Sequence, residues 1–303
     1  MTRPRHWYHR LAVRGVLWRQ YLDFGLTNVP FYLRPIMIFF WTIVFYFLAA
    51  PARRAILSNL RVVLPGSSAL FNHARAWLTL YNFAWTISDA ADHKLSQTEF
   101  AYEVEGAEFF EKLAAAEGAV LLTAHMGNYD LGAAVFAQRF QRQLRMVRAP
   151  EADQESARHL DESLARAGAG AVKVAYNTSG MTLPFELLQA IRQGEIVSIQ
   201  GDRAVGPVSQ RPAQLFGEQV SLPDGPFMLA FVAQVPIFPL FIVRTSYHRY
   251  RIVAREPIDC LRTERGREAA IEEGMQTWIR TLESVIAEHW SQWFSLVPIF
   301  PAR

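Results

Sequence analysis

The chain has 303 residues, of which 51% are hydrophobic, 13% aromatic and 19% charged. This composition excludes an intrinsically disordered protein, and the length is sufficient for one large domain or two modest ones. The formal net charge is +3, and the single cysteine, Cys260, excludes an internal disulfide and a metal cluster built on cysteines.

Positive charge is concentrated at the N-terminal end of the chain. The first 88 residues contain one acidic residue, Asp23, and ten arginines: Arg3, Arg5, Arg10, Arg14, Arg19, Arg34, Arg53, Arg54, Arg61 and Arg75. A basic segment of this kind can face nucleic acid or anionic lipid. An uncharged apolar run between Pro35 and Pro51 lies inside it, and this run favours a lipid surface over nucleic acid.

The apolar run is about fifteen residues long, which is short of the roughly twenty residues that a helix needs to cross a bilayer. Arginines flank it on both sides, so the distribution of charge does not orient it. The first twenty residues also lack the compact apolar core and cleavage site of a signal peptide. We therefore favour a monotopic or re-entrant membrane helix, with a spanning helix and a helix buried in the protein as the alternatives.

Two regions follow from the hydrophobic pattern. Residues 1–95 are predicted to form a helical, membrane-associating region, with helices at 52–64 and 72–95 after the apolar run. Residues 96–303 alternate between strands and helices, which is typical of an α/β domain with a mixed, mostly parallel sheet flanked by helices. Strands are expected at 100–106, 118–124, 144–150, 171–176, 195–202, 236–245 and 249–256, helices at 106–117, 130–140, 153–169, 183–194, 223–235 and 267–290, and a surface loop at 209–214.

Polar residues follow three of the expected strands at the point where each strand ends. The stretch TAHMGNYD places His125 after strand 118–124, Arg148 ends the next strand, and Asp202-Arg203 end strand 195–202. Sites in open α/β sheets form at the carboxyl ends of the strands. We therefore expect these four side chains to lie close together. Ion-pair roles for the two arginines and a turn or capping role for Asp202 are the structural alternatives.

The residue types at this edge suit acid–base chemistry. A neutral imidazole is a good general base near pH 7, and a carboxylate can fix its tautomer. His125 precedes an expected helix, and Asp130 lies in its first turn, although this spacing also arises by chance. Gly127 allows an unusual backbone angle and the close approach of a substrate, and the helix start offers N–H groups to an anion.

No serine or cysteine lies in a recognisable nucleophile elbow. The pattern therefore predicts direct transfer, in which the base activates an acceptor hydroxyl for attack on a thioester or an ester. No pair of histidines has metal-binding spacing, so we expect no metal and no cofactor.

The stretch HMGNYD resembles the His-x4-Asp/Glu motif of the lipid A biosynthesis (late) acyltransferase family, within the lysophospholipid acyltransferase-like superfamily. Further stretches resemble blocks of that family in the same order, from about residue 35 to residue 298. They are ARRAILSNLRVVLP, LRMVRAP, IQGDR, LFGEQVSLPDGPFMLAFVAQVPIFPLFIVR and LESVIAEHWSQWFSLVP.

The resemblance implies acyl transfer from acyl carrier protein, or from acyl-CoA, to a hydroxyl of a lipid or glycolipid at the cytoplasmic face of the inner membrane. Carried over by position, His125 is the base and Asp130 its partner. The resemblance also implies that Arg148 and Arg203 bind phosphate or stabilise the oxyanion, and that Asp202 could instead join the charge relay.

Three further residues are implied to bind substrate. Gly127 and Asn128 belong to the motif itself, and Gly225, in the turn Asp224-Gly225-Pro226, is implied to shape the acyl or acceptor cleft.

The chain departs from the family pattern in two places. The C-terminus, FSLVPIFPAR, lacks the usual His-Arg-Arg-x-Lys cluster, and Arg203 stands where glutamine is common. Both features are closer to members in pigment, aryl polyene or other glycolipid pathways, so the acceptor stays open. Two other functions also stay open on the residues: a thioesterase or lipid hydrolase that uses water at the same site, and a noncatalytic lipid-binding protein.

Removal of residues 1–50 is expected to move the protein from the membrane fraction to the soluble fraction, because the apolar run is the predicted anchor. Flotation on a density gradient separates membrane-bound protein from aggregate. A truncated chain that still floats with membranes would place the anchor elsewhere.

Overall fold

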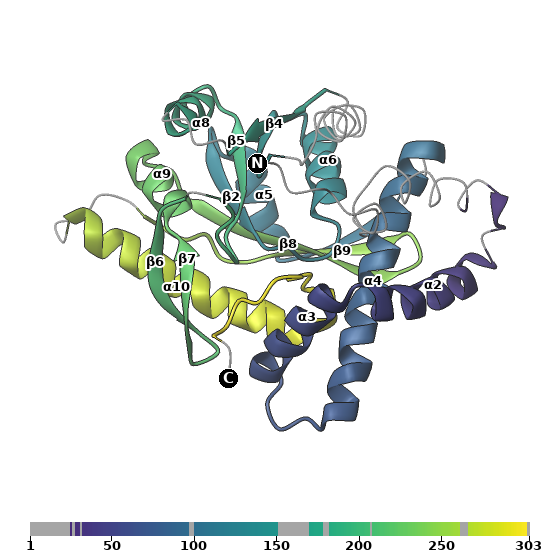
Figure 1. Cartoon of the computed structure of the whole chain (residues 1–303). Helices are drawn as coiled ribbons and strands as arrows, with labels where there is room; N and C mark the ends of the chain where they lie inside the picture. The colour runs from purple at the N-terminus through teal and green to yellow at the C-terminus, as the bar shows by residue number, and fades with distance from the viewer. Residues whose placement is uncertain are drawn as a thin grey trace, which may run out of the picture.

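The computed structural model describes residues 25, 28–30, 32–96, 100–150, 170–177, 182–206, 208–260 and 266–301 (Figure 1). The basic residues at the start of the chain and the helix expected at 153–169 lie outside the described residues.

Three helices form the N-terminal region: α2 (Arg34–Leu48), α3 (Ala50–Val63) and α4 (Ala69–Ser96). Pro35 and Pro51 each lie in the first turn of a helix, where a missing N–H is tolerated. Ala49 separates α2 from α3, and the two axes differ by 92°. Among the described residues no single helix is long and apolar enough to cross a bilayer, whereas this bent pair passes the same test together.

Large apolar side chains on these helices face outward. Phe40 of α2 is 62% exposed and Phe71 of α4 is 66% exposed. Exposed apolar residues on α2 and in the adjoining turns are Tyr32, Leu33, Ile36, Phe39, Phe40, Val44, Phe47 and Leu48, and Leu70 and Phe71 begin α4. Large apolar patches on a protein surface mark contact with another protein or with a membrane.

The α/β region contains one seven-stranded sheet with the order β1-β9-β8-β2-β5-β3-β4. Its strands are β1 (Ala101–Glu105), β2 (Ala119–Thr123), β3 (Leu144–Arg148), β4 (Val172–Tyr176), β5 (Ile196–Gln200), β8 (Ile237–Ser246) and β9 (Arg249–Ala254). The hairpin β8–β9 is antiparallel, and all other neighbours are parallel. The mixed, mostly parallel sheet predicted from the sequence is therefore confirmed.

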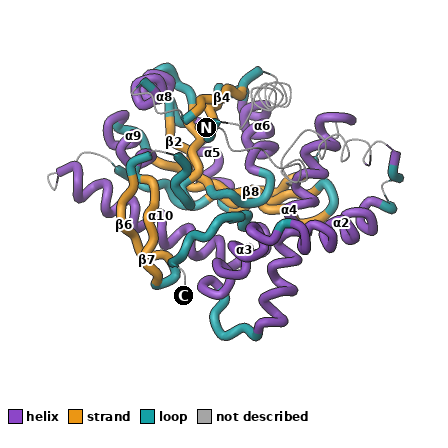
Figure 2. The backbone as a smooth tube through the Cα atoms, in the orientation of Figure 1, coloured by secondary structure: helices purple, strands orange, loops and turns teal. Residues whose placement is uncertain are grey.

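Helices cover both faces of the sheet, as Figures 1 and 2 show: α5 (Ala107–Ala115), α6 (Tyr129–Phe140), α8 (Leu183–Arg192), α9 (Gly225–Ala233) and α10 (Gly266–His289). Every residue of β2 is buried. Leu121 packs into one core with Phe136 of α6, and Leu122 packs into the other core with Trp278 of α10. Coverage on both faces explains why this strand is a continuous apolar run instead of an alternating one.

A separate hairpin lies outside this sheet. The strands β6 (Gln210–Leu215) and β7 (Glu218–Pro223) pair antiparallel, and both residues of the turn, Phe216 and Gly217, have positive φ. The surface loop expected at 209–214 is therefore wrong. Pro212 lacks an N–H, but it fits this strand because in a two-stranded hairpin one side of each strand needs no hydrogen bonds.

Buried ion pairs join the N-terminal helices to the sheet. Asp89 of α4 lies 2.9 Å from Arg244 of β8 and accepts a hydrogen bond from the Tyr250 hydroxyl at 2.5 Å. Asp92 of α4 lies 3.0 Å from His248, in the turn between β8 and β9, and 2.8 Å from Arg34 of α2. Burial raises the pKa of Asp89 even though Arg244 opposes it. Buried contacts thus cross the domain boundary expected at residue 95.

Candidate active site

Three neighbouring strands deliver the candidate residues to one edge of the sheet. Thr123 of β2 is paired with Gln200 of β5, so His125 and Asp202 each lie two residues beyond a matched pair. The Gly201 N–H donates to the Thr123 carbonyl at 2.8 Å and extends this pairing into the turn. Arg148 ends β3 on the other side of β5. The strand ends predicted to carry the site therefore do meet.

His125 is bonded to Asp202. The ring Nδ1 lies 2.7 Å from Asp202 Oδ1, and the backbone N–H of His125 donates to the same oxygen at 3.2 Å. The indole N–H of Trp293 donates to Asp202 Oδ2 at 2.9 Å. One buried carboxylate thus receives three hydrogen bonds.

The charge state of Asp202 follows from these contacts. The carboxyl is 0% exposed, and burial alone would raise its pKa. The charge and hydrogen bond of His125, the charge of Arg203 and the Trp293 hydrogen bond outweigh burial and hold the pKa at about 2. An ionised Asp202 accepts a hydrogen bond from the Nδ1–H group of His125, and this tautomer leaves the lone pair on Nε2.

Asp130 pairs with a different residue from the one expected. Its carboxylate lies 2.5 Å from the Arg148 guanidinium, whose carbon is 5.6 Å from the centre of the Tyr129 ring. The expected His125–Asp130 pair is thus corrected to His125–Asp202. The first turn of α6 directs Asp130 toward β3, whereas Asp202 lies beside His125 because β2 and β5 are neighbours in register.

Gly127 and Asn128 shape the turn that presents His125. Gly127 has φ of 52°, and a Cβ at this position would lie 1.7 Å from the Ile242 carbonyl oxygen. The unusual backbone angle is confirmed, but the close approach is made by the backbone of β8. Asn128 is 3% exposed, and its amide donates to the Thr86 carbonyl at 3.4 Å.

His125 opens onto a cavity of about 1190 Å³. The arginines Arg148, Arg203, Arg211 and Arg267 line it. Apolar side chains of α8 and α9 also line it: Leu183, Phe185, Leu187, Leu188, Met228, Leu229 and Val232. Gly225 also lines the cavity, whereas the described lining includes neither Gly127 nor Asn128. Pockets for drug-sized ligands measure about 300–1,000 Å³. This one therefore suits a larger molecule with both anionic and apolar parts.

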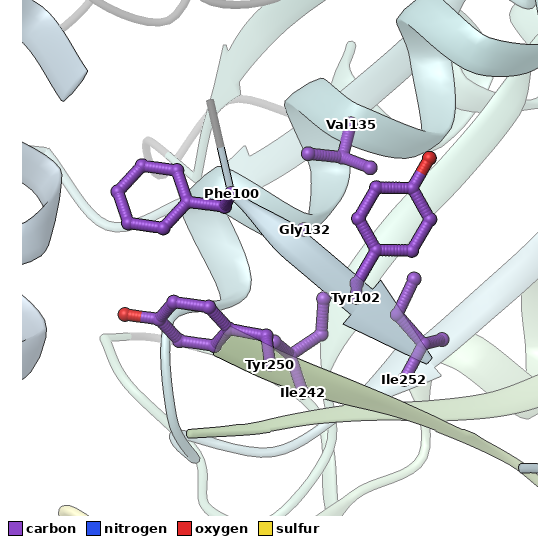
Figure 3. A pocket seen from close by; sticks show the side chains of 7 residues that line it. All are labelled: Phe100, Tyr102, Gly132, Val135, Ile242, Tyr250 and Ile252. Atoms are coloured by element: carbon purple, nitrogen blue, oxygen red, sulfur yellow. The ribbon is translucent and has the colours of Figure 1, made fainter. Parts of the chain in front are cut away.

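A second cavity lies between α6 and the strands β1, β8 and β9 (Figure 3). Its volume is about 10 Å³, which is roughly the space of one water molecule. Gly132 lies at this contact, and a Cβ there would be 1.4 Å from Ile242 Cδ1. This cavity is a packing gap between a helix and the sheet and is too small for a substrate.

The segment Gln292–Phe294 after α10 pairs with the turn that holds His125. The Gly127 N–H donates to the Gln292 carbonyl at 3.1 Å, and the Phe294 N–H donates to the His125 carbonyl at 2.7 Å. The sequence pattern assigned no role to Trp293. The feature that pointed to this residue was the Gln-Trp pair in the stretch LESVIAEHWSQWFSLVP, which resembles a block of the family. We call Gln292–Phe294 the C-terminal strap.

The family sequence model for bacterial lipid A biosynthesis acyltransferases matches residues 26–301. The chain belongs to this family. It is therefore an acyltransferase, and the family implies acyl transfer to lipid A precursors, with an acyl donor and a lipid acceptor as substrates. Members associate with the inner membrane. No curated protein matches the chain.

The acyltransferase is expected to lose stability in acid through Asp202. Its pKa lies near 2 in the folded protein and at 3.8 ordinarily, so its contribution is present above pH 4 and is lost as the pH falls. The full contribution is about 2 kcal/mol, and about 1 kcal/mol of it is lost by pH 3. Urea unfolding of detergent-solubilised wild type and Asp202→Asn between pH 5 and pH 3 measures this loss.

The gap in unfolding free energy between the two proteins should narrow as the pH falls. Glu103→Gln, which removes an exposed carboxylate, should follow the wild type throughout. A gap that is constant with pH would contradict an ionised, hydrogen-bonded Asp202.

Proposed function

We propose that this acyltransferase moves a fatty acyl chain from a thioester donor, acyl carrier protein or acyl-CoA, to a hydroxyl of a lipid or glycolipid, with His125 as general base. The observation that carries the proposal is the imidazole at the cavity wall, with Nδ1 held by the ionised Asp202. A base held in one tautomer and facing a large, partly apolar cavity suits a lipid hydroxyl.

The proposed reaction proceeds in two steps. Nε2 of His125 takes the proton of the acceptor hydroxyl while the hydroxyl oxygen attacks the thioester carbonyl, and a tetrahedral intermediate forms. Its collapse breaks the carbon–sulfur bond and leaves an ester on the acceptor. The departing thiolate takes the proton back from Nε2, so His125 ends as it began. Asp202 stabilises the imidazolium between the two steps.

Two arginines are proposed to bind the phosphate of a substrate or the oxygen that becomes negative. Arg203 lines the cavity, and its buried Nε has no hydrogen-bond partner among the described residues. Arg148 lines the same cavity, and Asp130 fixes its guanidinium. A buried donor without a partner is costly, and an anionic group in the cavity would satisfy it. Asp130 thus acts through Arg148 in this proposal.

The transferred acyl chain is proposed to lie against the apolar wall formed by α8 and α9. Met228 and Val232 lie one helical turn apart on α9, and Leu188 faces the same cavity from α8. Because His125 lies in the same cavity, a thioester carbonyl at the base can place its hydrocarbon along this wall.

We propose that the protein attaches to the cytoplasmic face of the inner membrane, with α2 lying in the membrane interface as a monotopic or re-entrant helix. The exposed aromatic and aliphatic side chains of α2 and the 92° bend into α3 support this placement.

His125→Ala is expected to lower acyl transfer by 10²-fold to 10⁴-fold, the usual contribution of a general base. Purified protein in detergent is given acyl carrier protein thioesters with and without a total lipid extract, and thiol release is followed. His73→Ala removes an exposed histidine on α4 and should leave the rate unchanged.

Full activity of a folded His125→Ala variant would refute the proposed role of His125 as general base. Release that needs both lipid and His125 supports transfer, whereas release without lipid would indicate a hydrolase. If no thiol is released, the same assay is run with acyl-CoA as donor.

Val232→Trp is expected to shift the preferred donor toward shorter acyl chains, because the larger side chain narrows the end of the proposed acyl site at the exposed part of α9. Rates with a series of thioesters of increasing chain length measure this shift. Ile87→Trp, at an exposed position of α4 outside the cavity lining, is the matched control. An unchanged chain-length profile with normal activity would place the acyl chain elsewhere.

A further inference from the structure

The C-terminal strap reaches the catalytic carboxylate from a part of the chain far from the other site residues. Trp293 is 91 residues from Asp202 in sequence, yet its indole N–H lies 2.9 Å from Asp202 Oδ2. Trp293 is 3% exposed and Asp202 is 0% exposed, so water does not readily replace this donor.

We propose that Trp293 is a positioning residue for the acyl transfer: its indole N–H holds Asp202 in the orientation in which Asp202 holds His125. This inference rests on the proposed function, because it assumes that His125 is the base.

The two oxygens of Asp202 have separate donors. Oδ1 accepts from the backbone N–H of His125 and lies against its Nδ1. Among the described residues, Trp293 is the hydrogen-bond donor to Oδ2. Because the two contacts fall on opposite sides of the carboxylate, together they fix its rotation. Without the indole N–H, the hydrogen bonds that the described residues make to this carboxylate would all come from His125.

The indole itself is held in place by its neighbours. The strap pairs with residues 125–127 on either side of Trp293, and the ring lies edge-on to Phe300 with centroids 6.4 Å apart. The side-chain amide of Gln292 exchanges two hydrogen bonds with the backbone of Arg244, at 2.7 Å and 2.8 Å. The strap is thus fixed both to the turn of His125 and to β8, so the indole N–H of Trp293 keeps its position relative to His125.

Loss of the indole N–H has a defined chemical consequence. Oδ2 would be left buried without its donor, and the carboxylate would become more basic. A more basic Asp202 holds the imidazolium more tightly, so the neutral, active form of the base would appear at higher pH. Rotation of the carboxylate would also misplace Nε2. The rate should therefore fall, and the acidic limb of the pH–rate profile should move to higher pH.

The experiment compares two replacements of Trp293 in the full-length protein in detergent. Trp293→Phe removes the N–H and part of the ring. Incorporation of 3-benzothienylalanine at position 293 replaces the N–H by sulfur and keeps the shape of the ring. Both should lower kcat/KM by about 10-fold to 100-fold, the range expected for a hydrogen bond to a charged group, with KM nearly unchanged.

Trp290→Phe is the matched control, because Trp290 lies near the same strap and its ring faces Arg75 instead of Asp202. It should leave the rate and the pH profile unchanged. Thermal unfolding of all variants separates a loss of positioning from a loss of fold.

Two results would overturn the inference. One is a folded benzothienylalanine variant with wild-type kcat/KM and an unshifted acidic limb of the pH–rate profile. The shape of the ring would then be sufficient for full activity without the N–H, whatever the activity of Trp293→Phe. The other is a rate loss in both variants without any movement of the acidic limb, which would indicate packing alone. If His125→Ala retains full activity, the proposed function fails first; if His125 is essential and the position 293 variants behave normally, only this inference fails.

Discussion

The hydrogen bond between His125 and Asp202 links the ends of the neighbouring strands β2 and β5, just beyond their last paired residues. An ionised carboxylate with no exposure is costly to bury unless donors surround it. Here the donors come from the turn after β2 and from the C-terminal strap. The site thus depends on the register of β2 and β5 and on the position of the chain end. A shift in either would leave a buried charge without partners, so the same contacts that orient His125 also constrain the fold.

The N-terminal helices are part of this arrangement. Asn59 of α3 is buried and hydrogen-bonds the backbone of Ser295, Val297 and Ile299, just after the strap. Asp89 of α4 binds Arg244, whose backbone is held by Gln292 of the strap. The helices α3 and α4 therefore contact residues that follow the strap or hold it in place. A membrane-bound α2 would set the orientation of the cavity relative to the lipid surface.

Much of the architecture could be predicted because local pattern and tertiary environment agree. Apolar runs alternating with amphipathic helices identified the strands of the sheet, and the polar residues after strands β2, β3 and β5 identified the edge that carries the site. The partner of His125 was mispredicted because sequence spacing favoured Asp130. The register between β2 and β5, which no single segment contains, places Asp202 there instead. The β6–β7 hairpin was missed because its first strand is polar and lies outside the main sheet. Trp293 was given no role because its contact with Asp202 joins residues 91 apart in sequence.

The place of the strap in the chain has a consequence for biosynthesis. His125 and Asp202 are synthesised well before Trp293, which lies 91 residues after Asp202 in the sequence. Until the last helix and the residues after it leave the ribosome, Oδ2 of Asp202 lacks its indole donor and the turn of His125 lacks its pairing partner. The strands β2, β5, β8 and β9 all precede Trp293 in the chain, but the orientation of Asp202 also needs the residues after α10. The contacts around Asp202 are thus completed only after α10 has been synthesised.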